Sequence, residues 1–250
     1  MKRNILFGTV ALMAGSLLAA ESGPKDEVKS AAKKLSEASY SWKSSVQNAG
    51  GGGGGGGRGR GGGGGPVEGK ISKEGFAVLS LTQGQNTTEA AMKGDKFAVK
   101  NQEGAWQSSA DLAAAAGGGG GGRGRGGVAA RLRTLKLPAA EAEDLLGKTK
   151  EVKKTEGVYS GDLTQEAVTQ LLRPAGGRRG GADAPAPTNA KGSAKFWVKD
   201  GVLSKYEYNV QGTVTVGEND VNINRTTTVE IKDVGTTNVT VPDEAKKKLS

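Results

Sequence analysis

The stretch that decides the fold is Phe196-Trp197-Val198-Lys199-Asp200-Gly201-Val202-Leu203-Ser204-Lys205-Tyr206. Apolar residues stand on both sides of the pair Asp200-Gly201, and an Asp-Gly pair suits the positive φ angles of a tight type I′ turn. The pattern predicts a hairpin in which residues 194–199 turn back over residues 202–216. Because two strands joined by two residues must run antiparallel, the hairpin predicts an antiparallel sheet.

Alternating apolar and polar residues continue on both sides of this hairpin. Downstream, the alternation predicts a strand over residues 221–232, a closing strand at Val239 and Val241, and a short helix from Pro242. Upstream, it predicts strands at 40–46, 67–71, 76–81, 87–92 and 97–100 and a short one at Trp106. Helical spacing instead marks 24–35, 128–135, 138–146 and, after an N-cap at Thr164, the residues up to 172. The order indicates an α+β domain, one antiparallel sheet with helices on one face.

Glycine-rich segments interrupt this pattern. They span residues 50–65, 117–127 and 176–190, and such sequence buries too little apolar surface to repay the entropy of ordering, so we expect flexible segments. Most of the charge of +9 belongs to them and to the N-terminus; without these the charge is about +1. The arginines concerned are Arg58, Arg60, Arg123, Arg125, Arg178 and Arg179.

The N-terminus has the three parts of a secretory signal peptide. Lys2 and Arg3 precede an apolar stretch over residues 5–18, and the small residues Ala19 and Ala20 precede the expected cleavage site. The alternative is an uncleaved anchor, although the run is short for a spanning helix. We therefore expect residues 1–20 to be a signal peptide and residues 21–250 a single soluble domain of the periplasm or cell envelope, without the cysteine that a lipid anchor needs.

The residue types present exclude several kinds of chemistry. The chain has no Cys and no His, which excludes disulfides, a Cys nucleophile, a Ser-His-Asp triad and His or Cys zinc sites. An enzyme of unrecognised type that uses a pair of carboxylates stays open, as a hypothesis beside the two given below. However, Glu141, Glu143 and Asp144 read as the solvated start of a helix. We expect no enzyme, cofactor or metal.

Arg225 is placed unusually for an arginine. It shares the alternation phase of Val221, Ile223, Val229 and Ile231, so it points toward the apolar face of its strand. One interpretation is an arginine at the sheet edge whose head group reaches water. The other is a polar residue at the mouth of a cavity, where it holds a covering helix or the head group of a ligand.

The hairpin resembles that of the LolA/LppX-like superfamily of periplasmic lipid and lipoprotein carriers. The stretches Gly157-Val158-Tyr159-Ser160-Gly161-Asp162-Leu163-Thr164 and Ile231-Lys232-Asp233-Val234-Gly235, followed by Val239-Thr240-Val241-Pro242, are similar to other parts of that superfamily. The resemblance implies a single strongly curved antiparallel sheet, an incomplete barrel, with helices on its concave face. The sequence departs from the family in its glycine-arginine insertions and in lacking the anchor cysteine of the LppX type.

The resemblance also implies a function, a carrier or binder of a lipid-like or acyl ligand in a cavity on the concave face. The expected cavity lining is Tyr40, Trp42, Phe76, Val78, Phe97, Trp106, Phe196, Tyr206, Tyr208, Arg225, Val229 and Ile231. The alternative for each of these residues is a place in a filled, dry core.

A second hypothesis is a structural or adhesive envelope module. In it, the basic glycine-arginine segments contact anionic polymers or an anionic membrane surface. Tracts of this composition also bind RNA, but those tracts interleave aromatic residues, and none occurs in these segments. A solvated insertion without a partner is the remaining interpretation.

Overall fold

The computed structural model describes residues 23–49, 65–117, 125–173, 185–216 and 219–250. The predicted signal peptide and most of the three glycine-rich segments lie outside these residues, as do Arg58, Arg60, Arg123, Arg178 and Arg179. Within the described ranges, one antiparallel sheet of 11 strands has the order β6-β5-β4-β3-β2-β1-β11-β10-β9-β8-β7. The sheet is not closed into a barrel, because β6 and β7 remain as its two edges. The predicted single antiparallel sheet is confirmed.

The strands follow the predicted segments closely. Their bounds are β1 Tyr40–Asn48, β2 Val67–Ile71, β3 Phe76–Gln83, β4 Asn86–Lys93, β5 Lys96–Lys100, β6 Trp106–Ser108, β7 Lys153–Thr155, β8 Val158–Asp162, β9 Thr188–Lys199, β10 Val202–Val216 and β11 Asn219–Lys232. The turn between β9 and β10 has φ angles of 53° at Asp200 and 74° at Gly201, as the predicted type I′ hairpin requires. The first six strands of the chain form one half of the sheet and the last five form the other, and the halves meet where β1 pairs with β11.

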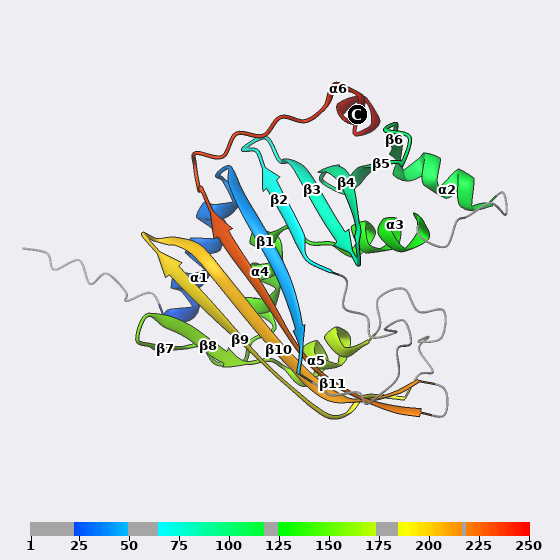
Figure 1. Ribbon diagram of the computed structural model, residues 1–250. Helices are drawn as coiled ribbons and strands as arrows, with labels where there is room; N and C mark the ends of the chain where they lie inside the picture. Colours follow the sequence, from blue (N-terminus) through cyan, green and yellow to red (C-terminus); the bar gives the residue numbers. More distant parts are fainter. Residues whose placement is uncertain (1–22, 50–64, 118–124, 174–184, 217–218) are drawn as a thin grey trace, which may run out of the picture.

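Helices cover mainly one face of the bent sheet. They are α1 Pro24–Ser36, α2 Ser109–Gly117, α3 Arg125–Thr134, α4 Pro138–Gly147, α5 Gln165–Leu172 and α6 Asp243–Lys248. Figure 1 shows α1, α4 and α5 together on one side of the sheet, with α6 near β6 at the other end. The Thr164 side chain accepts a hydrogen bond from the Ala167 amide at 3.3 Å, which confirms the predicted N-cap of α5.

The core has two parts, one on each face of the sheet. The larger part lies between the sheet and helices α1, α3, α4 and α5 and contains Leu35, Leu79, Leu132 and Phe196 among its fully buried residues. We call this side the inner face. The smaller part lies on the opposite side, the outer face, where α6 packs over β4, β5 and β6. We had predicted helices on one face only, and this is wrong for α6, which lies on the outer face.

One glycine on the inner face is required by packing. The indole of Trp42 on β1 lies over Gly69 on β2, and a Cβ built on Gly69 would meet the ring at 2.4 Å. The two residues are paired across the strands. Gly69 thus leaves the space that allows a large aromatic ring to lie flat on the sheet.

The structure differs from the local predictions at several places. Helix α2 occupies an alanine run for which we predicted no element, and α2 and α3 together take Gly117 and residues 125–127 out of the predicted flexible segment. Strand β9 begins at Thr188, inside the third segment, and β7 was not predicted. Val239 and Val241 do not close the sheet but lie on its outer face.

No helix among the described residues is long and apolar enough to cross a membrane.

Candidate functional site

The structure divides the predicted cavity lining between the two faces. Eight of its residues belong to the core of the inner face, namely Tyr40, Trp42, Phe97, Phe196, Tyr206, Tyr208, Val229 and Ile231. Phe76, Val78 and Trp106 lie on the outer face with α6, so their prediction as inner lining is wrong. The reason is that β3 reads Phe76-Ala77-Val78-Leu79, apolar at every position, and alternation cannot tell which face of such a strand is the inner one.

A polar cluster stands in the middle of the apolar inner face. The Glu141 carboxylate on α4 accepts hydrogen bonds from the Tyr206 hydroxyl at 2.5 Å and from the Tyr208 hydroxyl at 3.2 Å. Both tyrosines are on β10, and Tyr206 is fully buried. Beside them, Thr227 on β11 pairs with Tyr208 and is also buried. The three side chains of Glu141, Tyr206 and Tyr208 therefore join α4 to the sheet, and we call them the Glu141 cluster.

Burial perturbs the acid and the phenols of this cluster. Loss of water raises the pKa of the Glu141 carboxyl, although the hydrogen bonds from Tyr206 and Tyr208 act in the opposite direction. Burial and, after it, the neighbouring Glu141 carboxylate raise the pKa of both tyrosines. Burial also raises the pKa of Tyr40 to about 12. The phenols therefore stay protonated and act as donors toward Glu141.

We did not predict Glu141 as part of the site, and the signal for it was present. The buried residues of α4 include Pro138, Ala142 and Leu145. Glu141 lies three residues after Pro138 and four before Leu145, so helical spacing places it on the same face. The prediction of a solvated helix start fits Glu143, which is exposed, but not Glu141, which is partly buried and bonded to two phenols.

Arg225 reaches the helix layer, as its alternation phase indicated. Its guanidinium donates a hydrogen bond at 2.5 Å to the carbonyl oxygen of Leu171, near the C-terminal end of α5. A cation at the last carbonyls of a helix is favourable because those groups have no partner within the helix. Of the two interpretations, the contact with a covering helix is the one that the geometry matches.

The outer face carries a groove of about 610 Å³. Its floor is made by side chains from β11, β1, β2, β3 and β4, and one wall is the chain that follows β11. The lining residues used below are Lys43, Glu68, Lys70, Glu89, Lys232 and Val239. The predicted cavity was placed on the concave face, so this groove is a separate feature.

The arrangement excludes one further class of site for the part of the chain that the structure describes. No group of three or more His, Cys, Asp or Glu side chains there is close enough to hold a metal ion.

The flanks of the glycine-rich segments lie close together. The Ala49 amide, which precedes the first segment, donates to the Asn224 carbonyl at 2.8 Å, and the next residue, Arg225, contacts Leu171 just before the third segment. The Arg131 guanidinium of α3, which follows the second segment, donates to the Gly65 carbonyl at 2.5 Å, where the first segment ends. The chain thus enters or leaves all three segments along one side of the molecule.

No family model matches this chain, and no curated protein matches it.

Proposed function

We propose that the protein is an exported carrier or binder of a lipid-like, acyl ligand, with a fold of the LolA/LppX type. The ligand would lie between the inner face of the sheet and the helices. The observation that carries the proposal is the Glu141 cluster within an otherwise apolar layer. No catalysis is involved in this proposal.

The cluster supports a ligand site because packing alone has no need for it. A carboxyl group costs free energy when it loses water, and an apolar side chain in its place would avoid that cost. Buried groups with a shifted pKa are concentrated at functional sites. In binding sites, a few convergent polar groups in an apolar cavity orient the ligand. A ligand hydroxyl or ammonium group that donates to Glu141 would take the place of one phenol.

The apolar inner face supports the proposal by its extent. It continues from Phe97 on β5 to Tyr159 on β8, and it is covered by separate helices, not by a second sheet. In the described state the face is filled by its own side chains, and Tyr40, Tyr206, Phe97 and Phe196 are the largest of those that are fully buried. Binding of an acyl chain therefore requires the helices to move away from the sheet.

The test is ligand occupancy of protein taken from a cell envelope. Native mass spectrometry should find a co-purified lipid, and delipidated protein should bind palmitate that carries an environment-sensitive fluorophore. A matched pair of variants locates the site, because Ala90 and Ala91 are neighbours on β4, equally buried on opposite faces. Ala90→Ile should weaken probe binding and Ala91→Ile should not. Protein without lipid and without saturable probe binding would overturn the proposal.

Arg225 gives a more specific prediction for the helix layer. Arg225→Ala removes a hydrogen bond from a charged donor, worth about 1.5–3 kcal/mol, so amides of α5 should exchange with solvent about tenfold faster or more. Uptake of the acyl probe should accelerate as well, because α5 is less firmly attached. Hydrogen exchange and stopped-flow fluorescence measure the two effects.

Arg133→Ala is the matched control for this variant. Arg133 is exposed on α3 and makes no hydrogen bond or ion pair within the described residues. It should leave both rates unchanged. Equal exchange of α5 in wild-type protein and Arg225→Ala would show that this contact does not hold the helix.

We propose as a second candidate function that the glycine-arginine segments bring the protein to anionic membrane surfaces. The observation that favours it is the common side on which the flanks of the segments lie. Segments whose flanks lie on one side of the fold can act on one surface together, and each basic residue near an anionic bilayer contributes about 1 kcal/mol.

The corresponding prediction concerns Arg58, Arg60, Arg123, Arg178 and Arg179. Changing all five to serine should abolish binding to vesicles of anionic phospholipid, and raised salt should weaken binding of the wild type. The melting temperature should stay the same, because these residues lie outside the described core. Vesicle sedimentation and calorimetry measure the two properties. Undiminished vesicle binding would make the segments passive insertions.

A further inference from the structure

The chain that follows β11 crosses the outer face as an extended segment. Figure 1 shows it passing from the end of β11 over the ends of β1, β2 and β3 to α6. Its side chains alternate, since Thr237 and Val239 are partly buried and Val241 is buried, whereas Asn238 and Thr240 are exposed. Val239 and Val241 pack with the outer-face core. Alternation of this kind is the pattern of a β-strand lying on a surface.

This segment has a strand's side-chain pattern without a strand's hydrogen bonds. Among the described residues, no group donates to or accepts from the backbone of residues 238–241, although Thr236 and Thr237 before it and Lys246 after it are bonded. Backbone N–H and C=O groups in folded proteins are normally paired. Because the side chains point toward and away from the sheet, the backbone groups point sideways along the surface, and one side is the groove.

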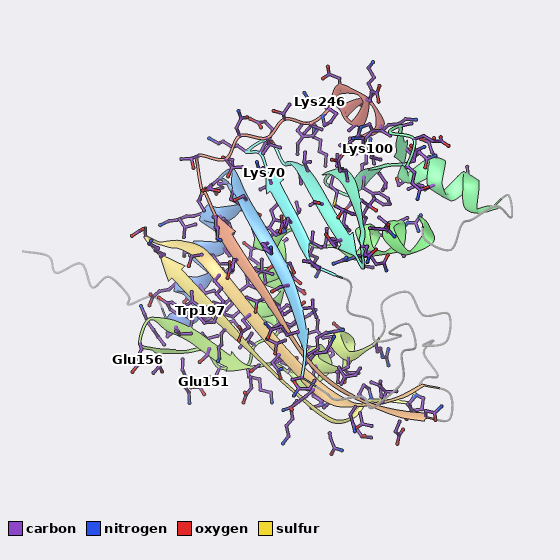
Figure 2. All side chains as sticks on the ribbon, in the orientation of Figure 1. Lys70, Lys100, Glu151, Glu156, Trp197 and Lys246 are labelled. Carbon is purple, nitrogen blue, oxygen red and sulfur yellow. The ribbon has the colours of Figure 1, made fainter. Side chains whose placement is uncertain are left out.

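The groove beside the segment is positively charged after its ion pairs are taken into account. Lys43 pairs with Glu68 at 2.7 Å, and Glu89 pairs with Lys100 at 2.8 Å. Lys232 pairs with Glu230 at 3.5 Å. Lys70 has no acidic partner within ion-pairing distance in the part of the chain described, and it lies on the groove floor near the C-terminal segment (Figure 2).

We propose that residues 238–241 are an acceptor strand for an extended acidic peptide of a partner protein, which lies in the groove and pairs with their backbone. Alternate side chains of the peptide would rest on the groove floor, one of them a carboxylate opposite Lys70. Main-chain pairing supplies affinity in this mode of recognition, and the pockets beneath alternate side chains supply specificity. The proposal uses the outer face alone and is independent of any ligand on the inner face.

The charge of the groove is the reason for choosing an acidic peptide. A basic or neutral strand could make the same backbone bonds but would leave Lys70 without a counter-charge or repel it. Complementary charge sets specificity and the rate of association. The groove also offers apolar contact to alternate side chains of the peptide, from Val78 on its floor and from Val239 on its wall.

The experiment uses synthetic peptides with the folded protein. The probe is a short acetylated and amidated peptide that alternates valine with glutamate, labelled for fluorescence anisotropy. It should bind saturably, and its counterpart with lysine in place of glutamate should bind about tenfold more weakly. A third peptide with an N-methyl group on every amide should not bind, because neither of its edges can donate to the segment. Absence of saturable binding, or equal binding of the N-methylated peptide, overturns the proposal.

Two neighbouring proline variants test the backbone of the segment itself. Successive residues of a strand point their backbone groups to opposite edges, and proline removes one donor while tolerating extended backbone. Of Val239→Pro and Thr240→Pro, one should abolish peptide binding and the other retain it, with melting temperatures checked for both. Binding that survives in both variants would sink the idea. A dimer that one of the variants abolishes would also overturn it and assign the edge to a second copy of the chain.

Lys70→Glu tests the charge with a matched control. It should invert the preference, so that the lysine peptide binds better than the glutamate peptide. Lys96→Glu makes the same charge change at an exposed position outside the groove and should leave the preference unchanged. An unchanged preference in Lys70→Glu would contradict an acidic partner at this site.

Discussion

Replacing Phe196 by alanine should lower the free energy of unfolding by about 3–5 kcal/mol, because it leaves a cavity in a packed interior. Phe196 is fully buried on β9, where it pairs with Tyr206 on one side and Tyr159 on the other. The loss combines the transfer of the ring to water with the contacts that its neighbours cannot recover. Urea denaturation of the two proteins measures it.

Phe76→Ala is the matched control on the other face. Phe76 is a phenylalanine on a strand of the same sheet, but it is only partly buried and lies under Lys93, whose ammonium is 4.2 Å from the ring centre. We expect a smaller loss, about 1–2 kcal/mol, since less apolar area leaves water. The larger cost for Phe196 follows from the face on which it lies.

The comparison also bears on how a ligand would be admitted. A loss for Phe196→Ala near the upper figure means that the inner face is closed and fully packed without a ligand. A loss no larger than that of Phe76→Ala would contradict this packing and indicate that space already exists beside the ring. If the inner face is fully packed, Phe196→Ala creates a new cavity. An added palmitate probe should stabilise this variant more than the wild type, because the cavity accepts part of the acyl chain.

The sequence was sufficient for most of the strands because their signals are local. The Asp200-Gly201 turn and the alternation after it depend on neighbouring residues, and both hold in the structure. Local sequence could not show which side chains of β3 point to the inner face, because Phe76-Ala77-Val78-Leu79 is apolar at every position. The side that α6 covers is decided by residues far along the chain. Val239 and Val241 illustrate the same limit, since alternation predicts extended backbone but not the strand with which it pairs.

The site was less accessible to sequence reasoning than the fold. Tyr206 and Tyr208 were expected as cavity lining from the resemblance, but their partner is on a helix more than sixty residues away in the chain. Helical spacing could have placed Glu141 on the buried face of α4. That it meets two phenols depends on how α4 lies against β10, which no local pattern contains.

Glu141 should make the protein less stable as the pH rises. Burial raises its carboxyl pKa above the ordinary value of 4.5, so between those two values the folded state holds a proton that the unfolded state has lost. Stability falls with pH wherever the folded state binds more protons. Below 4.5 both states are protonated, and above the raised pKa both are ionised, so the loss occurs between the two values. Each unit by which the pKa is raised corresponds to about 1.4 kcal/mol.

Glu141→Gln should remove this dependence and keep the geometry, because the amide oxygen still accepts from Tyr206 and Tyr208. The other charges that act on Glu141 are those of Lys136 and Asp144, and the variant retains both. Denaturation from pH 4 upward should show the variant gaining stability over the wild type as the pH passes 4.5 and rises, and a constant difference at higher pH. Glu143→Gln, on the exposed side of the same helix, should follow the wild type throughout. Parallel curves for wild type and Glu141→Gln would mean that the carboxylate keeps its water, and the Glu141 cluster would then lose its place in the proposed ligand site.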